Sequence, residues 1–389
     1  MILSTVEMHT GGEPTRIVVD GWPAFSGKTL LDKRREAKER FDHLRRGLML
    51  EPRGHDGMYG ALLVEPDHPD ADLAVLFMHN EGYSTMCGHA TIALARWAVE
   101  SGKVVRTEPE TVVRLQCPCG LVTARVAADG TVRFESVPAF AYALDRIAPT
   151  AIWGPVTVDI AYGGAFYAIL AADSIGLDLR TSPMRAIVDA GEEIALAAAK
   201  AIPIEHPSEP DLAFLYGTIL TDGDHGAGGQ PSRNVCIFAG RQIDRSPTGS
   251  GVTARMALMA AQRQVRADEE RLFESCTGAH FSGRIVRDAP AVGPRKAVIV
   301  EVGGRAQIDR PEVSSKELQY GKFFLQGDAS TAHVDCGILP AGQALHFRYI
   351  AAVHTPGVWT VPSEFGDPQW VANAYYTRLR VYAGPVGSA

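Results

Sequence analysis

The chain has 389 residues, of which 46% are hydrophobic and 21% are charged, and its formal net charge is −7. That length corresponds to about two to three domains, and the composition is that of a globular chain with enough apolar residues for a sizeable core. The acidic excess argues against nucleic acid as a partner, because phosphate backbones attract basic surfaces.

Apolar runs and cysteine spacing exclude further classes of protein. No apolar run approaches the roughly 20 residues that span a bilayer, and the N-terminus lacks the basic and apolar regions of a secretory signal. We therefore expect no membrane partner and a cytoplasmic location. The six cysteines are too sparse for a disulfide framework and are expected to be thiols. Cys117-Pro118-Cys119 is more closely spaced than zinc ligands usually are, so we expect no metal.

In chain order, the first half begins with two short apolar segments around a turn that carries Gly11, Gly12 and Pro14. Apolar residues at spacings of three and four predict one helix over 31–48, and its mixed charges indicate a solvated outer face. Strands are expected at 61–64, 73–78, 111–115, 121–126 and 131–134.

The second half has the same mixture of strands and helices. Turn residues over 138–155 lead into it, and an alanine-rich helix is expected at 184–200. Strands are expected at 156–160, 162–170, 212–220 and 235–238. The whole pattern predicts an α+β protein. We place its N-terminal half at 1–150, its C-terminal half at 151–305 and an atypical segment at 306–389.

One arrangement occurs once in each half. The strand at 73–78 is followed by a loop and by Cys87 at the start of an expected helix, and the strand at 235–238 leads in the same way to Thr248. The match is either a coincidence of two glycine-bearing helix starts or a long-range repeat. Such a start exposes N–H groups and a positive dipole end to an anion such as a carboxylate. It also lowers the pKa of a cysteine toward the thiolate, which we expect for Cys87.

Four motifs, ordered along the chain, resemble the proline racemase family. They are Met8 to Pro14 (MHTGGEP), Glu51 to His55 (EPRGH), Met86 to Thr91 (MCGHAT) and Asp244 to Gly251 (DRSPTGSG). The resemblance covers about residues 5–305. It implies a fold similar to that of diaminopimelate epimerase: two pseudo-symmetric α/β halves, each a sheet wrapped round a central helix, with the active site between them. Racemases and epimerases of the family place a cysteine at both helix starts.

The second helix start departs from that pattern, because it carries Thr248 instead of a cysteine. Within the family this is the pattern of members that dehydrate trans-3-hydroxy-L-proline. A thiol titrates near about 8.5, whereas an alcohol is too weak an acid to return a proton to the α-carbon. The resemblance implies a hydro-lyase in which Cys87 removes the α-proton and the β-hydroxyl leaves, giving Δ1-pyrroline-2-carboxylate and water. Two alternatives remain: a proline or hydroxyproline epimerase or racemase, and an inactive member that binds proline-like ligands.

The resemblance also implies roles for neighbouring residues. Gly88 and His89 are expected to contact the substrate, with His89 orienting its ring nitrogen or the thiolate, and Asp244 is expected to hold its ammonium. Gly249 and Ser250 are expected to bind the carboxylate through backbone N–H groups. A capping role for Asp244 and a place on a helix face for His89 are the alternatives. Three other residues either line the cleft or only form turns: His9, His55 and Asp56.

No metal or organic cofactor is implied, because the substrate ammonium and the helix N–H groups can stabilise the carbanion. The expected partner is the small-molecule hydroxyproline, and a homodimer is left open. The residues after Arg305 do not follow the family, whose last strands help to complete the first domain, so closure of that domain is an open question. This segment is either an alternative C-terminus or an accessory segment, and it can be partly disordered.

Overall fold

This computed structural model describes residues 2–207 and 209–308, and beyond them the backbone of five strands that lie between 312 and 385. The chain divides into two compact units, Met1–Gln307 and Ile308–Ala389. Every residue that the sequence singles out for the site lies in the first unit. No helix in the described part of the chain is long and apolar enough to cross a membrane.

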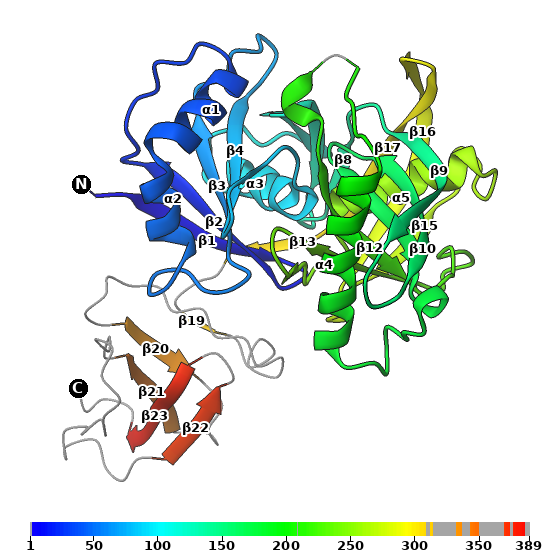
Figure 1. Cartoon of the computed structure of the whole chain (residues 1–389). Coiled ribbons are helices and arrows are strands. Elements are labelled where there is room, and N and C mark those ends of the chain that lie inside the picture. Colours follow the sequence, from blue (N-terminus) through cyan, green and yellow to red (C-terminus); the bar gives the residue numbers. More distant parts are fainter. Residues whose placement is uncertain are drawn as a thin grey trace. The chain divides into compact units, whose positions relative to one another are not determined.

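The first half is a sheet of strands from the N-terminal third of the chain (Figure 1). These strands are β1 (Ser4–Thr10), β2 (Glu13–Asp20), β3 (Tyr59–Val64), β4 (Leu73–His79), β5 (Tyr83–Ser84), β6 (Glu110–Cys117), β7 (Gly120–Ala127) and β8 (Val132–Glu135). β1 and β2 form an antiparallel hairpin, and Gly11 and Gly12 in its turn both adopt a positive φ. β2 pairs in parallel with β3, and β6, β7 and β8 pair antiparallel in sequence order.

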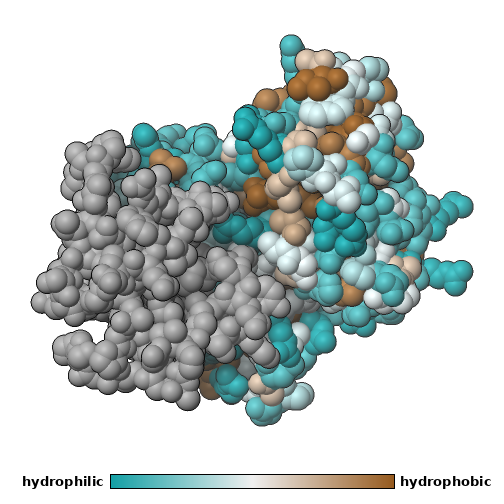
Figure 2. Space-filling model, turned by 90° about the horizontal axis from the view of Figure 1, so that it is seen from below, coloured by the Kyte–Doolittle hydropathy of each residue, from teal (hydrophilic) through white to brown (hydrophobic). Residues whose placement is uncertain are grey.

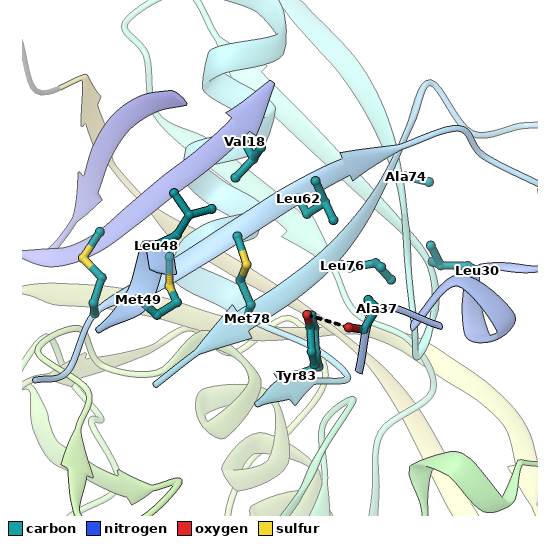
Figure 3. Packing of buried hydrophobic residues seen from close by; sticks show 11 residues of the cluster. Val18, Leu30, Ala37, Leu48, Met49, Leu62, Ala74, Leu76, Met78 and Tyr83 are labelled. Carbon is teal, nitrogen blue, oxygen red and sulfur yellow. Dashed lines mark hydrogen bonds between the residues drawn. The ribbon is translucent and has the colours of Figure 1, made fainter. Parts of the chain in front are cut away.

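Two short helices pack on this sheet, α1 (Leu30–Arg40) and α2 (Asp42–Met49). The expectation of a single helix over 31–48 is therefore wrong. Phe41 separates the two helices because its φ of −119° and ψ of 11° lie outside helical geometry. The helices and the sheet share one buried apolar cluster, most of which Figure 3 labels: Val18, Leu30, Ala37, Leu48, Met49, Met58, Leu62, Ala74, Leu76, Met78 and Tyr83.

The second half has its own set of strands. They are β9 (Phe140–Pro149), β10 (Pro155–Tyr162), β11 (Phe166–Ala171), β12 (Leu215–Thr221), β13 (Ser232–Phe238), β14 (Gln242–Ile243), β15 (Arg271–Glu274), β16 (His280–Val292) and β17 (Arg295–Gly304). β9, β10 and β11 pair antiparallel in order, and β12 lies parallel to β11 and antiparallel to β13. The helix α4 (Met184–Ala201) packs against β9, β12 and β13, and η1 (Ala172–Ile175) and η2 (Pro210–Leu212) are short 3₁₀ turns.

Each half surrounds one central helix. α3 (Gly88–Glu100) packs against β1, β2, β6, β7 and β8, and α5 (Gly249–Ala261) packs against β9, β10, β11, β16 and β17. Almost every residue of both helices is buried, which explains why small and apolar residues occur on all sides of both rather than on one face. The predicted fold class, two α/β halves with a sheet wrapped round a central helix in each, is confirmed.

The halves are joined through the last strands of the first unit. β17 lies between β16 and β8, so it pairs with a strand of each half. The chain then returns to the first half as β18 (Ala306–Ile308), which pairs with β1. The Ala306 carbonyl also accepts a hydrogen bond from Arg96 Nη1 at 2.7 Å. Residues just after Arg305 therefore contribute a strand to the first half. The predicted limits at 150 and 305 stay predictions.

The second unit is described by its strands alone. β19 (Glu312–Val313) pairs in parallel with β20 (Ala332–Cys336), and β21 (Gln343–Tyr349) pairs antiparallel with β20 and with β23 (Tyr376–Pro385). β22 (Gln369–Asn373) completes the sheet beside β23. The expectation of partial disorder in 306–389 concerns connecting residues that lie outside the described ones.

In the coloured part of Figure 2, apolar groups lie in patches separated by hydrophilic ones. Large apolar side chains that stay exposed in the second half include Leu144, Ile147, Ile152 and Leu196. Such scattered exposure is common in soluble proteins and defines no site by itself.

Candidate active site

The N-termini of α3 and α5 meet at their first residues. A Cβ added to Gly88 would lie 2.4 Å from Gly249 Cα, and one added to Gly249 would lie 2.7 Å from Gly88 Cα. Real Cβ atoms do not approach so closely, so the two backbones can touch only because both residues are glycine. Their positive dipole ends converge, which makes the junction a site for an anion such as a carboxylate.

Cys87 is the N-cap residue of α3, and its Sγ accepts a hydrogen bond from the Ala90 N–H at 3.4 Å. The side chain is 5% exposed. Burial raises the pKa of the thiol well above its usual value. The Ala90 N–H has the next largest effect and lowers it, while the charges of Asp244 and Glu13 raise it. The expected net lowering by the helix start is therefore wrong, because loss of water outweighs the dipole.

His89 faces this thiol from the first turn of α3. Its Nδ1 lies 3.1 Å from Cys87 Sγ, and its Nε2 lies 3.3 Å from the Pro14 carbonyl oxygen. A carbonyl oxygen only accepts, so the proton of the neutral ring sits on Nε2 and a lone pair on Nδ1 faces the thiol. Burial lowers the pKa of His89, although Asp244 and the Pro14 carbonyl raise it, and this favours the neutral ring. The role of His89 in the site stays a prediction.

Asp244 lies in the loop before α5, with 4% exposure. Its Oδ1 accepts a hydrogen bond from the Ser246 N–H at 2.7 Å, and its Oδ2 lies 4.0 Å from His89 Nδ1. The next residue, Arg245, donates its N–H to Glu13 Oε2 at 2.8 Å, which ties the loop to β2 in the other half. Oδ1 of Asp244 thus helps to form a turn, which is close to the capping role given as the alternative for this residue. Oδ2 faces the junction of the two helices.

Thr248 occupies the cap position of α5 in a left-handed conformation with φ of 63°. A β-branched residue is strained there, and such strain is found most often at functional sites. Its Oγ1 is buried and has no hydrogen-bond partner of normal geometry among the described residues. The Cys236 thiol is close by: burial raises the pKa of Cys236 well above its usual value, and the Thr248 hydroxyl offsets part of that rise.

Four further residues were predicted from the sequence to belong to the site or its cleft: Ser250, His9, His55 and Asp56. The Ser250 hydroxyl is 2.7 Å from the Tyr167 hydroxyl, so its side chain is engaged, while the first-turn N–H groups of α5 lack helical acceptors by their position. His9 is on β1 opposite Pro14. His55 and Asp56 form a turn through a 2.8 Å contact between His55 Nδ1 and the Asp56 carbonyl oxygen. The structure brings Cys87, His89, Asp244 and Thr248 together and leaves His55 in a turn.

The sequence analysis missed a group of hydroxyls beside the thiol. Tyr59 at the start of β3 is 2% exposed, and its hydroxyl lies 2.5 Å from Ser84 Oγ. Tyr216 interacts with both of these residues and also borders a cavity of about 740 Å³. The cavity is lined from α1, from the β4–β5 turn and from β12, with Arg34, His79, Tyr83 and Tyr216 among its residues. Only the position of Tyr59 just after the 51–55 motif could have indicated it.

The class of protein follows from this fold and from sequence comparison. Residues 5–312 match the sequence model of the proline racemase family, and the chain belongs to that family. Residues 281–389 match a second family model, described as a domain of unknown function.

Particular relatives are similar over nearly their whole length. The chain is 52% identical over 311 residues to trans-L-3-hydroxyproline dehydratase of Xenopus tropicalis, covering 78% of this chain and 89% of that protein. It is 52% identical over 314 residues to trans-3-hydroxy-L-proline dehydratase of Homo sapiens, with 78% and 88% covered. A 3-hydroxyproline 2-epimerase of Burkholderia multivorans is 45% identical, with 79% and 92% covered. The crystal structure of a hydroxyproline epimerase from Agrobacterium vitis with bound trans-4-OH-L-proline has a TM-score of 0.75 and 29% identity, with 79% and 91% covered.

Proposed function

We propose that this protein is a hydro-lyase that converts trans-3-hydroxy-L-proline to Δ1-pyrroline-2-carboxylate and water. The dehydratases of two vertebrates at 52% identity support the substrate. The observation that carries the proposal is the pairing of one thiol and one alcohol, Cys87 and Thr248, at two helix starts whose backbones touch. This arrangement provides a base on one face of a bound ring and no equivalent acid on the other.

The substrate carboxylate binds at the junction of the two helices. First-turn N–H groups of Gly88, His89, Gly249 and Ser250 converge there with the positive ends of both dipoles. The substrate ammonium binds near Asp244 Oδ2, the oxygen that faces the junction, with His89 beside it. These contacts hold the α-carbon between the Cys87 thiol and the Thr248 hydroxyl.

Substrate binding also prepares the base. In the ligand-free protein, the charge of Asp244 is among the groups that raise the pKa of the Cys87 thiol. An ammonium placed against Asp244 offsets that charge, so the thiol loses its proton more readily. His89 Nδ1, 3.1 Å from Sγ, accepts this first proton. The active base therefore forms once a zwitterionic amino acid is bound.

The elimination itself needs one thiolate. In the trans isomer the 3-hydroxyl lies on the same face as the α-hydrogen, opposite the carboxylate. The Cys87 thiolate takes the α-proton as the C2–H bond breaks, and the new thiol gives that proton to the hydroxyl as the C3–O bond breaks. Water leaves, the thiolate is regenerated, and the enamine tautomerises to the cyclic imine. The helix N–H groups and the ammonium stabilise the carbanion, and no cofactor is needed for these steps.

A 3-hydroxyproline epimerase is the second candidate. The Burkholderia multivorans relative at 45% identity favours it, and so does the Cys236 thiol beside the Thr248 hydroxyl, which is a possible proton source on the opposite face. Epimerisation in D₂O gives cis-3-hydroxy-D-proline that carries deuterium at C2. We expect no such product, because the alcohol between Cys236 and the ring is too weak an acid.

The test is to incubate the purified full chain with trans-3-hydroxy-L-proline and to assay the cyclic imine. We expect turnover by the parent protein and near-complete loss in Cys87→Ser, because serine is not ionised near neutral pH. Binding of pyrrole-2-carboxylate, a planar mimic of the carbanion, shows whether the variant is still folded. A Cys87→Ser protein that turns over at the parental rate contradicts the proposal, as does equal turnover of cis-3-hydroxy-L-proline.

We further propose a cytoplasmic location, supported by the free thiols of the five cysteines whose side chains the structure describes. A homodimer remains compatible with this function but has no support from particular residues.

A further inference from the structure

The turn between β1 and β2 lies in the first family motif, Met8 to Pro14, and the reaction steps above use none of its side chains. Gly11 at its tip has a φ of 60°, which glycine adopts without strain. A Cβ at Gly11 would lie 2.9 Å from Ala279 Cβ and 3.5 Å from Ser246 Cβ. The tip of this first-half turn therefore packs directly against the second half, on the loop that also carries Asp244.

One side of the turn holds His89 in the first turn of α3. Thr10 is fully buried, and its Oγ1 donates a hydrogen bond to the His89 carbonyl oxygen at 2.9 Å. The Pro14 carbonyl oxygen lies 3.3 Å from His89 Nε2. The turn therefore contacts both the main chain and the ring of His89.

The other side of the turn holds the loop of Asp244. Glu13 has no exposed surface, and its Oε2 accepts a hydrogen bond from the Arg245 N–H at 2.8 Å. Thr277 adds a second link, because its Oγ1 lies 2.9 Å from the Arg245 carbonyl oxygen and 3.2 Å from the Gly11 carbonyl oxygen. Both main-chain polar groups of Arg245, the residue next to Asp244, are thus engaged.

The turn is therefore a shared support for two residues that come from different halves. Asp244 Oδ2 lies 4.0 Å from His89 Nδ1, and this spacing depends on how the loop of the second half is held against the first. A carboxylate oxygen accepts a stronger hydrogen bond than a neutral acceptor does. Among the contacts of the turn, the one made by Glu13 is thus suited to fix the loop.

We propose that Glu13 is a positioning residue, which keeps the Asp244 carboxylate, through Arg245, at the place where the substrate ammonium binds. This inference rests on the proposed function, in which Asp244 holds that ammonium, and Glu13 itself touches no substrate. A specific defect follows from it. When Glu13 is removed, ligands that carry an ammonium lose affinity, whereas ligands with a neutral ring nitrogen keep theirs.

The experiment compares two ligands by calorimetry on the full chain. L-Proline carries an ammonium and has no 3-hydroxyl to eliminate, whereas the ring nitrogen of pyrrole-2-carboxylate is neutral. A hydrogen bond to a charged group is worth about tenfold or more in an equilibrium constant. Glu13→Ala should therefore raise the dissociation constant of L-proline about tenfold and that of pyrrole-2-carboxylate by less than about twofold. Glu13→Gln keeps an oxygen that can accept the Arg245 N–H, so it should restore most of the affinity for L-proline.

Glu36→Ala is the matched control. Glu36 is also a buried glutamate of the first half, and its Oε2 accepts the main-chain N–H groups of Ser26 at 2.8 Å and Gly27 at 2.9 Å. Those groups lie in the loop before α1, so this variant should leave both dissociation constants unchanged.

Thr277→Val is a second probe of the same support. Thr277 is exposed, and valine keeps its shape while removing the hydroxyl that reaches Arg245 and Gly11. We expect a selective loss of affinity for L-proline of about threefold, smaller than that of Glu13→Ala because a neutral hydrogen bond is weaker.

The proposal is overturned if folded Glu13→Ala loses affinity for both ligands equally or for neither, with folding judged by its melting temperature. Equal behaviour of Glu13→Ala and Glu13→Gln also overturns it, because the accepted hydrogen bond would then not matter. If Glu13→Ala does not fold, Thr277→Val decides, and the absence of a selective loss there overturns the proposal.

Asp244→Asn separates this inference from the proposed function. A selective loss of L-proline affinity in Asp244→Asn without one in Glu13→Ala overturns the positioning role alone. If the parent protein does not bind L-proline, or if Asp244→Asn binds it as the parent does, the ammonium site is wrong and the inference falls with it. A protein that does not turn over hydroxyproline but shows the selective loss in both variants contradicts the dehydration and supports the positioning role.

Discussion

The site depends on two side chains, each in an environment that ordinary examples of its type avoid. In the proposed mechanism Cys87 ionises while enclosed with two carboxylates nearby, and burial is the largest of the influences on its pKa. Thr248 is a β-branched residue in the left-handed region, with its hydroxyl buried. Both features have a cost in stability, of about 1 to 3 kcal/mol for a strained backbone position. Such costs are expected where a residue is placed for chemistry rather than for folding.

Changing Thr248 to cysteine tests the one-sided chemistry. Thr248→Cys supplies a second thiol on the opposite face, and a thiol can return a proton to the α-carbon near its own pKa. We expect some cis-3-hydroxy-D-proline, with deuterium at C2 when the reaction is run in D₂O, measured by chiral chromatography and mass spectrometry.

Thr248→Ser is the control for that variant, because it keeps an alcohol at the same position. It should give no inverted product. If Thr248→Cys also gives none while remaining folded, then more than one residue separates dehydration from epimerisation.

At the scale of elements, the site is made by two helices that meet end to end. Each helix is enclosed by its own sheet, which fixes its axis and leaves its N-terminus as the part that can reach the other half. The close approach is possible because Gly88 and Gly249 have no side chain. Backbone contact brings two sets of free N–H groups to one point, and this is what makes the junction suited to a carboxylate.

Gly88→Ala tests this contact. The added Cβ would overlap Gly249 Cα, so the helix starts must move apart, and overpacking of this kind costs about 1 to 3 kcal/mol. We expect a lower free energy of unfolding, measured in urea. We also expect the dehydration rate to fall by more than the smaller folded fraction explains.

Gly47→Ala provides a matched control on α2. No atom lies within 4 Å of a Cβ at Gly47, so alanine should fit and should stabilise the helix by about 0.5 to 1 kcal/mol without changing activity. Equal behaviour of the two alanine variants would contradict the assigned contact.

At the scale of the whole molecule, strands near both ends of the first unit hold that unit together. β1 and β18 are almost at its two termini, and they pair with each other. β17 crosses between the halves by pairing with β8 and β16. The first unit therefore needs the chain to continue to about residue 308, which lies within the family match over residues 5–312. The residues that follow form the separate unit Ile308–Ala389.

Two truncated proteins test this organisation. A chain of residues 1–308 keeps β18, so we expect it to fold and to dehydrate trans-3-hydroxy-L-proline at the rate of the full chain. A chain of residues 1–304 leaves β1 without this partner and Arg96 without the Ala306 carbonyl. Its free energy of unfolding should fall by about 1 kcal/mol for each hydrogen bond lost, so it should unfold at a lower urea concentration. Equal stability of the two chains would show that β18 contributes nothing to the first half.

The sequence by itself determined the α+β class and the position of both helix starts, because periodicity, turn glycines and motif spacing are local properties, and the resemblance to the family added the two-half fold. Cys87 and Thr248 could be singled out from the motifs, as could His89 and Asp244. The break at Phe41 was missed, since the apolar spacing continues across it while the backbone leaves the helix. Strand β18 was missed because its partner, β1, lies at the other end of the unit.

Only the tertiary structure decided the electrostatics of the site. Burial sets the direction in which the Cys87 pKa shifts, and Asp244 and Glu13, which lie on other elements, add to the rise. A helix start considered in isolation is exposed to water, and its dipole then favours the thiolate. Once the sheets enclose both helices, water is removed and burial becomes the larger effect, so the pKa of the same cysteine rises.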